Sequence, residues 1–170
     1  MRFVALGLLL VAGGLSSCSN QVMARRPVSY RFEYGRTALI RDGVAYAPRS
    51  APDAVKRAIA AGNRLQSMPY KWGGGHRQQS DSGYDCSGSV SYVLREAGLL
   101  QGSMSSTGFL DYGRPGPGQW ITLYCRKGHV FMTVAGLRLD TGSGSNQSGP
   151  RWRTSTREGR GHAMRHPRGL

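Results

Sequence analysis

The stretch Tyr84-Asp85-Cys86-Ser87-Gly88 decides the fold of this chain, because it places a cysteine where a loop ends and a helix begins. Apolar residues recur at helical spacing from Val90 to Ala97, and Gly98 ends the pattern. Asp85 is then the expected N-cap, and Cys86 falls in the first turn. Unpaired backbone N–H groups and the helix dipole favour a thiolate there. The pattern predicts a reactive thiol.

A free cysteine can also be a small buried apolar residue, and this alternative applies to Cys86. Its neighbours Asp85, Ser87 and Gly88 are polar or small, which suits an exposed helix start better than a core. The local sequence therefore favours a functional cysteine.

The second informative stretch is Gly128-His129-Val130, which follows a turn and begins a run of strand-forming residues. Nucleophilic catalysis by cysteine needs a base within hydrogen-bond reach and usually a third group that orients the base. His129 is the candidate base. Asp140 lies on the next expected strand, and a short turn at Gly136 could bring it opposite His129. Asp140 could equally be a capping or turn residue before Gly142.

The remaining elements predict an α+β fold in which helices pack on an antiparallel sheet. Ser50 and Asp53 have capping-box spacing, so a helix is expected to begin near Ser50 and to stop before Pro69. Asp42-Gly43 suggests a hairpin turn. The expected strands cover residues 120–125, 129–135, 137–141 and 162–166.

The N-terminus is typical of an exported protein. A positive start and a short apolar run precede Leu15-Ser16-Ser17-Cys18, which resembles a bacterial lipobox. We therefore expect a signal peptide over residues 1–17 and lipidation of Cys18, with an ordinary secretory signal as the alternative. Residues 18–49 are expected to be a lipidated N-terminus and tether, and residues 50–170 a single catalytic domain with an Arg-rich C-terminal segment.

The chain has 170 residues, 23 Lys plus Arg against 9 Asp plus Glu, and a formal net charge of +14. Such a surface attracts polyanions. Anionic cell-wall polymer or lipid headgroups are the expected partners, because no nucleic-acid recognition motif is present. His162 and His166 lack the further ligands of a metal site. No metal and no cofactor are expected.

The cysteines leave one question open at the level of sequence. If Cys18 carries lipid, Cys86 and Cys125 remain, and in an oxidising compartment they could form a disulfide that would silence Cys86. Cys125 lies in an apolar run, so a packed strand residue is the commoner outcome.

Four stretches together resemble the NlpC/P60 cysteine peptidases, in the family's order: Pro69-Tyr70-Lys71-Trp72-Gly73-Gly74, Tyr84-Asp85-Cys86-Ser87-Gly88, Pro117-Gly118 and Gly128-His129-Val130. The similarity spans roughly residues 52 to 145. It implies a circularly permuted papain-like fold. It also implies hydrolysis within peptidoglycan stem peptides, commonly between D-glutamate and the following diamino acid.

The resemblance also implies residue roles. Cys86 is the nucleophile, His129 the base and Asp140 the third polar residue. Tyr70 faces the active site and helps to stabilise an oxyanion, while Asp85 and Ser87 shape the substrate subsite.

The chain departs from the family pattern at three places. Asp140 stands where the family often has His, Gln119 replaces an acidic residue after Pro-Gly, and the segment between Gly75 and Tyr84 is long. The expected function is an exported, lipid-anchored cysteine endopeptidase of the bacterial cell envelope that acts on peptidoglycan stem peptides. The alternatives are a non-catalytic wall-binding lipoprotein with the same fold, and acyl transfer by the same Cys/His pair.

Overall fold

The computed structural model of the chain describes residues 21–77, 80–142 and 148–170. The expected signal peptide and Cys18 lie outside these residues, so their assignment stays a prediction. No helix in the described ranges is long and apolar enough to cross a membrane.

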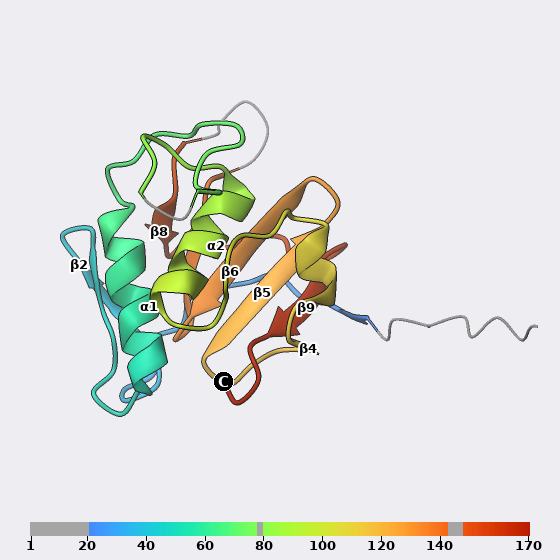
Figure 1. Cartoon of the computed structure of the whole chain (residues 1–170). Helices are drawn as coiled ribbons and strands as arrows, with labels where there is room; N and C mark the ends of the chain where they lie inside the picture. The colour runs from blue at the N-terminus through green and yellow to red at the C-terminus, as the bar shows by residue number, and fades with distance from the viewer. Residues whose placement is uncertain (1–20, 78–79, 143–147) are drawn as a thin grey trace, which may run out of the picture.

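An antiparallel sheet forms the centre of the molecule (Figure 1). Within the described residues its path runs β1-β9-β5-β6-β7-β8, and β4 pairs with β9. The strands are β1 (Val22–Met23), β4 (Arg114–Pro115), β5 (Ile121–Arg126), β6 (His129–Val134), β7 (Leu137–Asp140), β8 (Arg151–Arg153) and β9 (Ala163–His166). The predicted meander is β5-β6-β7, and the predicted last strand is β9.

Two helices, α1 (Asp53–Arg64) and α2 (Cys86–Glu96), pack side by side against the same face of this sheet (Figure 1). A short 3-10 helix covers Gly108–Asp111. Along β6, alternate side chains Val130, Met132 and Val134 join the core beneath the helices. His129 and Phe131 occupy the alternate positions, so their side chains lie on the face of the sheet away from the helices.

The first helix differs from the expectation at its start, while its end falls before Pro69 as expected. It begins at Asp53, with Pro52 as its N-cap and no side-chain capping bond, and it ends at Arg64. The Ser50 hydroxyl instead donates a hydrogen bond to the backbone carbonyl of Gly35, at 2.6 Å. The predicted capping box is thus wrong, because a tertiary contact takes the hydroxyl that would have capped the helix.

The segment expected to be a tether is instead packed against the domain. β1 pairs with β9, and the backbones of Val28 and Arg157 exchange hydrogen bonds of 2.7 and 2.9 Å. Further along, β2 (Leu39–Arg41) and β3 (Val44–Tyr46) form the hairpin predicted at Asp42-Gly43. A polar, Arg-rich composition predicted a free segment here, but unpaired strand edges supply backbone partners for it.

Candidate active site

The candidate nucleophile lies at the start of α2, as predicted. The Asp85 carboxylate accepts a hydrogen bond of 2.6 Å from the backbone N–H of Gly88, and Asp85 itself has extended backbone geometry. This is the N-cap arrangement that begins a helix at Cys86. The Cys86 side chain is half-buried and carries a free thiol. The thiol is therefore partly accessible, and Cys86 is not the fully buried apolar residue that was the alternative.

The candidate base, His129, is buried at the first position of β6. The tight turn before it depends on Gly128, whose φ of 82° lies in the left-handed region that glycine adopts without strain. The imidazole Nε2 lies 3.2 Å from the Asp140 carboxylate, and the ring also hydrogen-bonds to Cys86. Since Nε2 faces Asp140, Nδ1 is the ring nitrogen left for the thiol. The strand thus brings Cys86, His129 and Asp140 into one line of contacts.

Asp140 is almost wholly buried, and three cationic groups surround its carboxylate. Besides His129, Arg138 Nη1 donates to Oδ2 at 2.5 Å and Arg157 Nε lies 3.2 Å from the same oxygen. Burial would raise the pKa of Asp140, but His129, Arg157 and Arg138 together hold it below its ordinary value. Asp140 is therefore a buried ionised acid, rather than only a turn residue.

The charge on Asp140 acts directly on the imidazole. Burial alone would lower the pKa of His129, but the hydrogen bonds and charge interactions with Asp140 and Cys86 outweigh it and raise the pKa above its ordinary value. An imidazolium that is stabilised beside a thiol is what a thiolate nucleophile needs as its counter-ion.

The β6-β7 hairpin explains how the sequence brings these groups together. Ala135 and Gly136 form a two-residue turn with φ of 45° and 75°, and Val134 pairs with Leu137. Leu139 pairs with Met132, so the next residue, Asp140, stands one position closer to the start of β6. There its carboxylate reaches His129. The predicted turn at Gly136 thus has the predicted effect.

Tyr70 lies in a loop that runs beside the residues before Cys86. Its backbone bridges Tyr84, whose N–H donates to the Pro69 carbonyl at 3.0 Å. Gly88 permits this approach, because a Cβ there would lie 1.9 Å from the Gly74 carbonyl oxygen. The structure therefore places Tyr70 beside the start of α2, and its role in oxyanion stabilisation stays a prediction.

Asp85 and Ser87 form a polar cluster with a third residue, His76. The Asp85 carboxylate accepts from Ser87 Oγ at 3.0 Å, lies 3.2 Å from His76 Nε2 and also accepts from the backbone N–H of Gly73 at 3.0 Å. At the level of sequence His76 could contact substrate from its loop, but a solvated loop histidine was the preferred interpretation, and nothing in its spacing predicted the contact with Asp85.

Asp81, in the stretch before Tyr84, bonds to the loop that carries Tyr70. Its carboxylate accepts from Lys71 Nζ at 2.9 Å and from the Gly75 N–H at 3.1 Å. The Lys71 hydrogen bond, with those of the backbone, holds the pKa of Asp81 well below its usual range. Asp81 thus braces the loop that carries Tyr70.

Cys125 does not compete for the Cys86 sulfur. Both cysteines are free, and Cys125 is fully buried on β5 among core residues. Burial raises the pKa of its thiol to about 12, so Cys125 stays protonated and inert.

No group of three or more His, Cys, Asp or Glu side chains is placed to hold a metal within the parts of the chain that the structure describes. His162 and His166 lie around strand β9 rather than on a helix, and their Nδ1 atoms face the backbone carbonyls of Gly159 and Gly116 at 3.2 and 3.0 Å.

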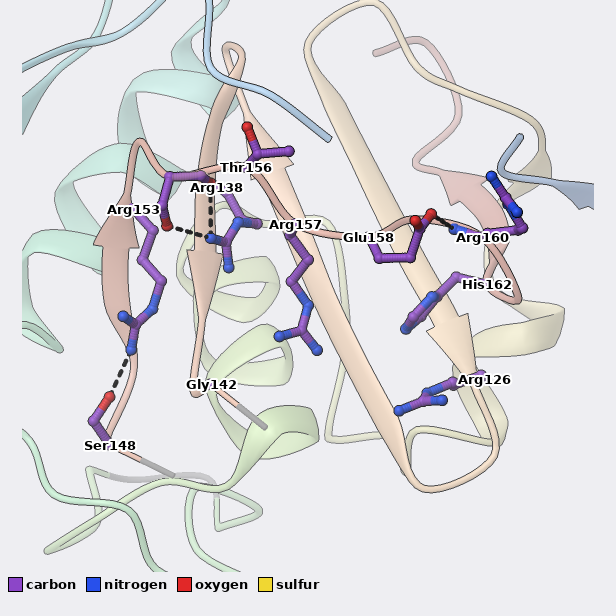
Figure 2. Close-up of a pocket in the computed structure, with 11 residues that line it drawn as sticks. Arg126, Arg138, Gly142, Ser148, Arg153, Thr156, Arg157, Glu158, Arg160 and His162 are labelled. Atoms are coloured by element: carbon purple, nitrogen blue, oxygen red, sulfur yellow. Dashed lines mark hydrogen bonds between the residues drawn. The ribbon is translucent and has the colours of Figure 1, made fainter. Parts of the chain in front are cut away.

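Sequence reasoning missed the arginines behind the candidate triad. Arg138 and Arg157 both contact Asp140, and both line a cavity on the sheet face away from the helices (Figure 2). Arg138 is predictable in hindsight only from alternation on β7, which puts it on the same side as Asp140. Arg157 comes from a loop between strands and has no signal in its spacing.

Fold and site together define an α+β domain with a candidate cysteine nucleophile at a helix start and a candidate base on the adjoining sheet. Comparison with known proteins confirms the resemblance predicted from the motifs, although no protein-family model matches the chain.

A similar curated protein is peptidoglycan endopeptidase RipB of Mycobacterium tuberculosis, known from two strains. It is 31% identical over 115 residues, which cover 52% of this chain and 47% of the relative. The chain thus spans about half the length of the curated relatives it matches. Among solved structures, the hypothetical invasion protein Rv1477 of Mycobacterium tuberculosis superposes with a TM-score of 0.50 and 21% identity, covering 69% of this chain and 65% of that one. That likeness supports the fold alone.

Proposed function

We propose that the protein is an exported cysteine endopeptidase that hydrolyses amide bonds in peptidoglycan stem peptides, at the bond between D-glutamate and the following diamino acid. The observation that carries this proposal is the continuous contact from Cys86 through His129 to the buried carboxylate of Asp140. A non-catalytic wall-binding protein has no need of a buried acid and base aligned on an accessible thiol.

The reaction follows from the placement of the three groups. The Cys86 thiolate attacks the scissile carbonyl carbon, and the carbonyl oxygen becomes an oxyanion held by backbone N–H groups at the start of α2 and by Tyr70. The C–N bond then breaks as the His129 imidazolium gives its proton to the leaving amine. A water molecule, deprotonated by His129, then attacks the thioester carbonyl, and the C–S bond breaks to release the acyl group as a carboxylic acid and restore the Cys86 thiolate beside the His129 imidazolium. Asp140 keeps the imidazole oriented throughout.

The substrate class rests on the sequence similarity to a named peptidoglycan endopeptidase and on charge. A cell-wall substrate places the protein in the cell envelope. Within this proposal Cys18 carries the lipid that holds it at a membrane, and the net charge of +14 draws it to anionic wall polymer.

The test compares Cys86→Ala with Cys125→Ala on purified peptidoglycan, with the released fragments identified by mass spectrometry. Loss of the nucleophile is expected to reduce the rate by about a thousandfold or more, whereas Cys125→Ala retains activity because that thiol is inert. Full wall-degrading activity in Cys86→Ala would overturn the proposal. The same spectra distinguish hydrolysis, which adds water to the acyl fragment, from transfer to another amine.

A second measurement separates an enzyme from a binding protein without a substrate. At about pH 7 an unactivated thiol is largely protonated and reacts slowly with iodoacetamide. We expect rapid alkylation of Cys86 in the wild type and slow alkylation in His129→Ala. Equal rates in the two proteins would favour the wall-binding alternative.

A further inference from the structure

A basic cavity of about 570 Å³ lies on the sheet face away from the helices (Figure 2). Cys86 and His129 are not among the described residues that line it. Five arginines from β5, β7, β8 and the loop before β9 do line it: Arg126, Arg138, Arg153, Arg157 and Arg160. The cavity is therefore distinct from the space around the candidate nucleophile.

Positive charge in this cavity exceeds negative charge. The Asp140 carboxylate pairs with Arg138 and Arg157. Glu158, the acid among the described lining residues, accepts a hydrogen bond of 2.8 Å from a backbone N–H. Burial lowers the pKa of Arg138, and the charges of Arg157 and Arg153 lower it further against the opposing effect of Asp140. The arginines thus repel one another, and an anion in the cavity would offset this repulsion.

Two of the guanidinium groups point toward a common space. Figure 2 shows the side chains of Arg126 and Arg157 converging on it from β5 and from the loop before β9. The Arg157 side chain is only 15% exposed, and it lies over the Phe131 ring, 5.1 Å from the ring centroid. This stacking fixes the direction of its donors. A solvated surface arginine, the ordinary alternative, would be neither covered nor held in this way.

The loop that carries Arg157 is held by the N-terminal segment. The backbones of Val28 and Arg157 exchange hydrogen bonds of 2.7 and 2.9 Å, and the hydroxyls of Ser29 and Thr156 lie 3.2 Å apart. Donors that are held in place before a ligand arrives bind it at a lower entropic cost. The cavity is therefore preorganised to bind an anion.

The number and directions of the arginines favour a phosphate group as the ligand. A carboxylate has its oxygens in one plane and carries a single charge, so one guanidinium fork can satisfy it. A phosphate group has oxygens in a tetrahedral arrangement and more negative charge, so it can accept from guanidiniums that approach from different sides. A cavity of this volume is in the range that holds a small molecule. We therefore expect a phosphate ester rather than a lone ion.

We propose that this cavity is a phosphate-binding site, in which Arg126 and Arg157 hold the phosphate group and Arg153 adds to the positive charge around it. The ligand is a phosphate ester, either a soluble one or the headgroup of an anionic lipid. The site goes beyond the proposed peptidase activity and does not depend on it, because it involves neither Cys86 nor His129. It gives the protein a ligand other than the stem peptide.

The binding test titrates the full-length wild type with glycerol phosphate by calorimetry, at an ionic strength held constant with sodium chloride. We expect saturable binding with a Kd of about 1 mM or tighter. Arg126→Gln should weaken it about tenfold, because a charge-assisted hydrogen-bonding group is lost. Arg126 is exposed at the end of β5, so the variant should fold normally, which a thermal melt without ligand checks. Arg153→Gln, on β8, should weaken binding in the same direction.

The matched control is Arg41→Gln. Like Arg126, Arg41 is an exposed arginine at the last position of a strand before a hairpin turn, but it lies on β2 and does not line the cavity. This control should leave the Kd within about twofold. An equal effect of Arg126→Gln and Arg41→Gln would overturn the inference, because binding would then reflect general electrostatic attraction. Absence of saturable binding by the wild type would overturn it as well.

Competition identifies the source of the phosphate group. Vesicles of phosphatidylglycerol should suppress the binding of glycerol phosphate if a lipid headgroup reaches the cavity, whereas vesicles of zwitterionic phosphatidylcholine should not. Suppression by phosphatidylglycerol alone assigns the site to an anionic lipid headgroup, and unchanged binding assigns it to a soluble phosphate ester. No step of the test requires cleavage, so its failure would leave the endopeptidase proposal standing, and an inactive enzyme would still bind phosphate.

Discussion

At the scale of single residues, the Asp140 carboxylate serves two structures at once. One oxygen orients His129, and the other neutralises Arg138 and Arg157. Both guanidiniums approach the same oxygen, so removal of the carboxylate would leave like charges together at a largely buried site. The acid therefore links the chemistry of the cleft to the integrity of the basic cavity.

Replacement of this acid should change the pH dependence of the reaction. In Asp140→Asn the charge that raises the pKa of His129 is lost, so the imidazolium deprotonates at lower pH. We expect the alkaline limb of kcat/KM to move to lower pH and the rate to fall by about a hundredfold or more. The check is a pH–rate profile, with Asp53→Asn, an exposed acid, as the control.

A thermal melt of the same variant separates chemistry from stability. Asp140→Asn should also unfold at lower temperature, because Arg138 and Arg157 lose the carboxylate that pairs with them at a buried site. An alkaline limb that stays in place would show that Asp140 does not act on His129.

Tyr70 provides a second prediction at this scale. If its hydroxyl helps to hold the oxyanion, Tyr70→Phe should lower kcat by about a hundredfold while KM stays nearly constant. Steady-state kinetics on a stem-peptide substrate test this. Tyr46→Phe, an exposed tyrosine on β3, is the matched control, and a change confined to KM would assign Tyr70 to substrate binding instead.

At the scale of elements, the contact between α2 and the Tyr70 loop is the tightest part of the site. Gly74 and Gly88 bring the two backbones together, and Asp85 bonds to both segments through the N–H groups of Gly73 and Gly88. One carboxylate thus caps the helix and positions the loop. The same contact therefore positions both the nucleophile and the loop of Tyr70.

Gly88→Ala should disrupt this contact between α2 and the Tyr70 loop. The added methyl group would lie 1.9 Å from a backbone carbonyl, which cannot move aside as a flexible side chain can. We expect a loss of about 2 kcal/mol in the free energy of unfolding, measured by urea denaturation, together with most of the activity. Lys56→Ala, which removes only an exposed ion pair on α1, should cost about 0.5 kcal/mol or less.

How well an element could be predicted depended on whether local or distant contacts form it. α2 and the β5-β6-β7 meander follow from periodicity, an N-cap and glycine turns, all of which are local. The start of α1 was misplaced because Ser50 bonds to Gly35, a contact that periodicity cannot register. Arg157 was missed as a site residue, and the contact of His76 with Asp85 was not predicted, for the same reason.

At the scale of the whole molecule, the N-terminal segment and the loop after β8 support each other. Val28 and Arg157 pair across the sheet face that carries the cavity, and β1 extends the sheet beyond β9. The sequence predicted the α+β architecture but not this layer, and its assignment of the triad residues stays a prediction. The strand β1 of this layer is only two residues long, Val22–Met23, which is too short to show an alternating pattern.

Val28→Pro tests this support. Proline removes the N–H that donates to the Arg157 carbonyl, so the loop over the cavity should open more often. Hydrogen exchange of the amides in residues 155–160 should quicken, while exchange in β6 stays slow. Val28→Ala keeps both backbone bonds and should exchange as the wild type does; equal protection in Val28→Pro would show that the pairing contributes nothing.

The pairing of β1 also bears on where a lipid-anchored form could work. If Cys18 carries the lipid, four peptide steps separate it from Val22, where the chain joins the sheet. A fully extended chain covers about 14 Å in that distance. The domain would then be confined to the layer of wall next to the membrane, with its cationic surface close to the lipid headgroups. Newly made strands would be within its reach, and the outer wall would not.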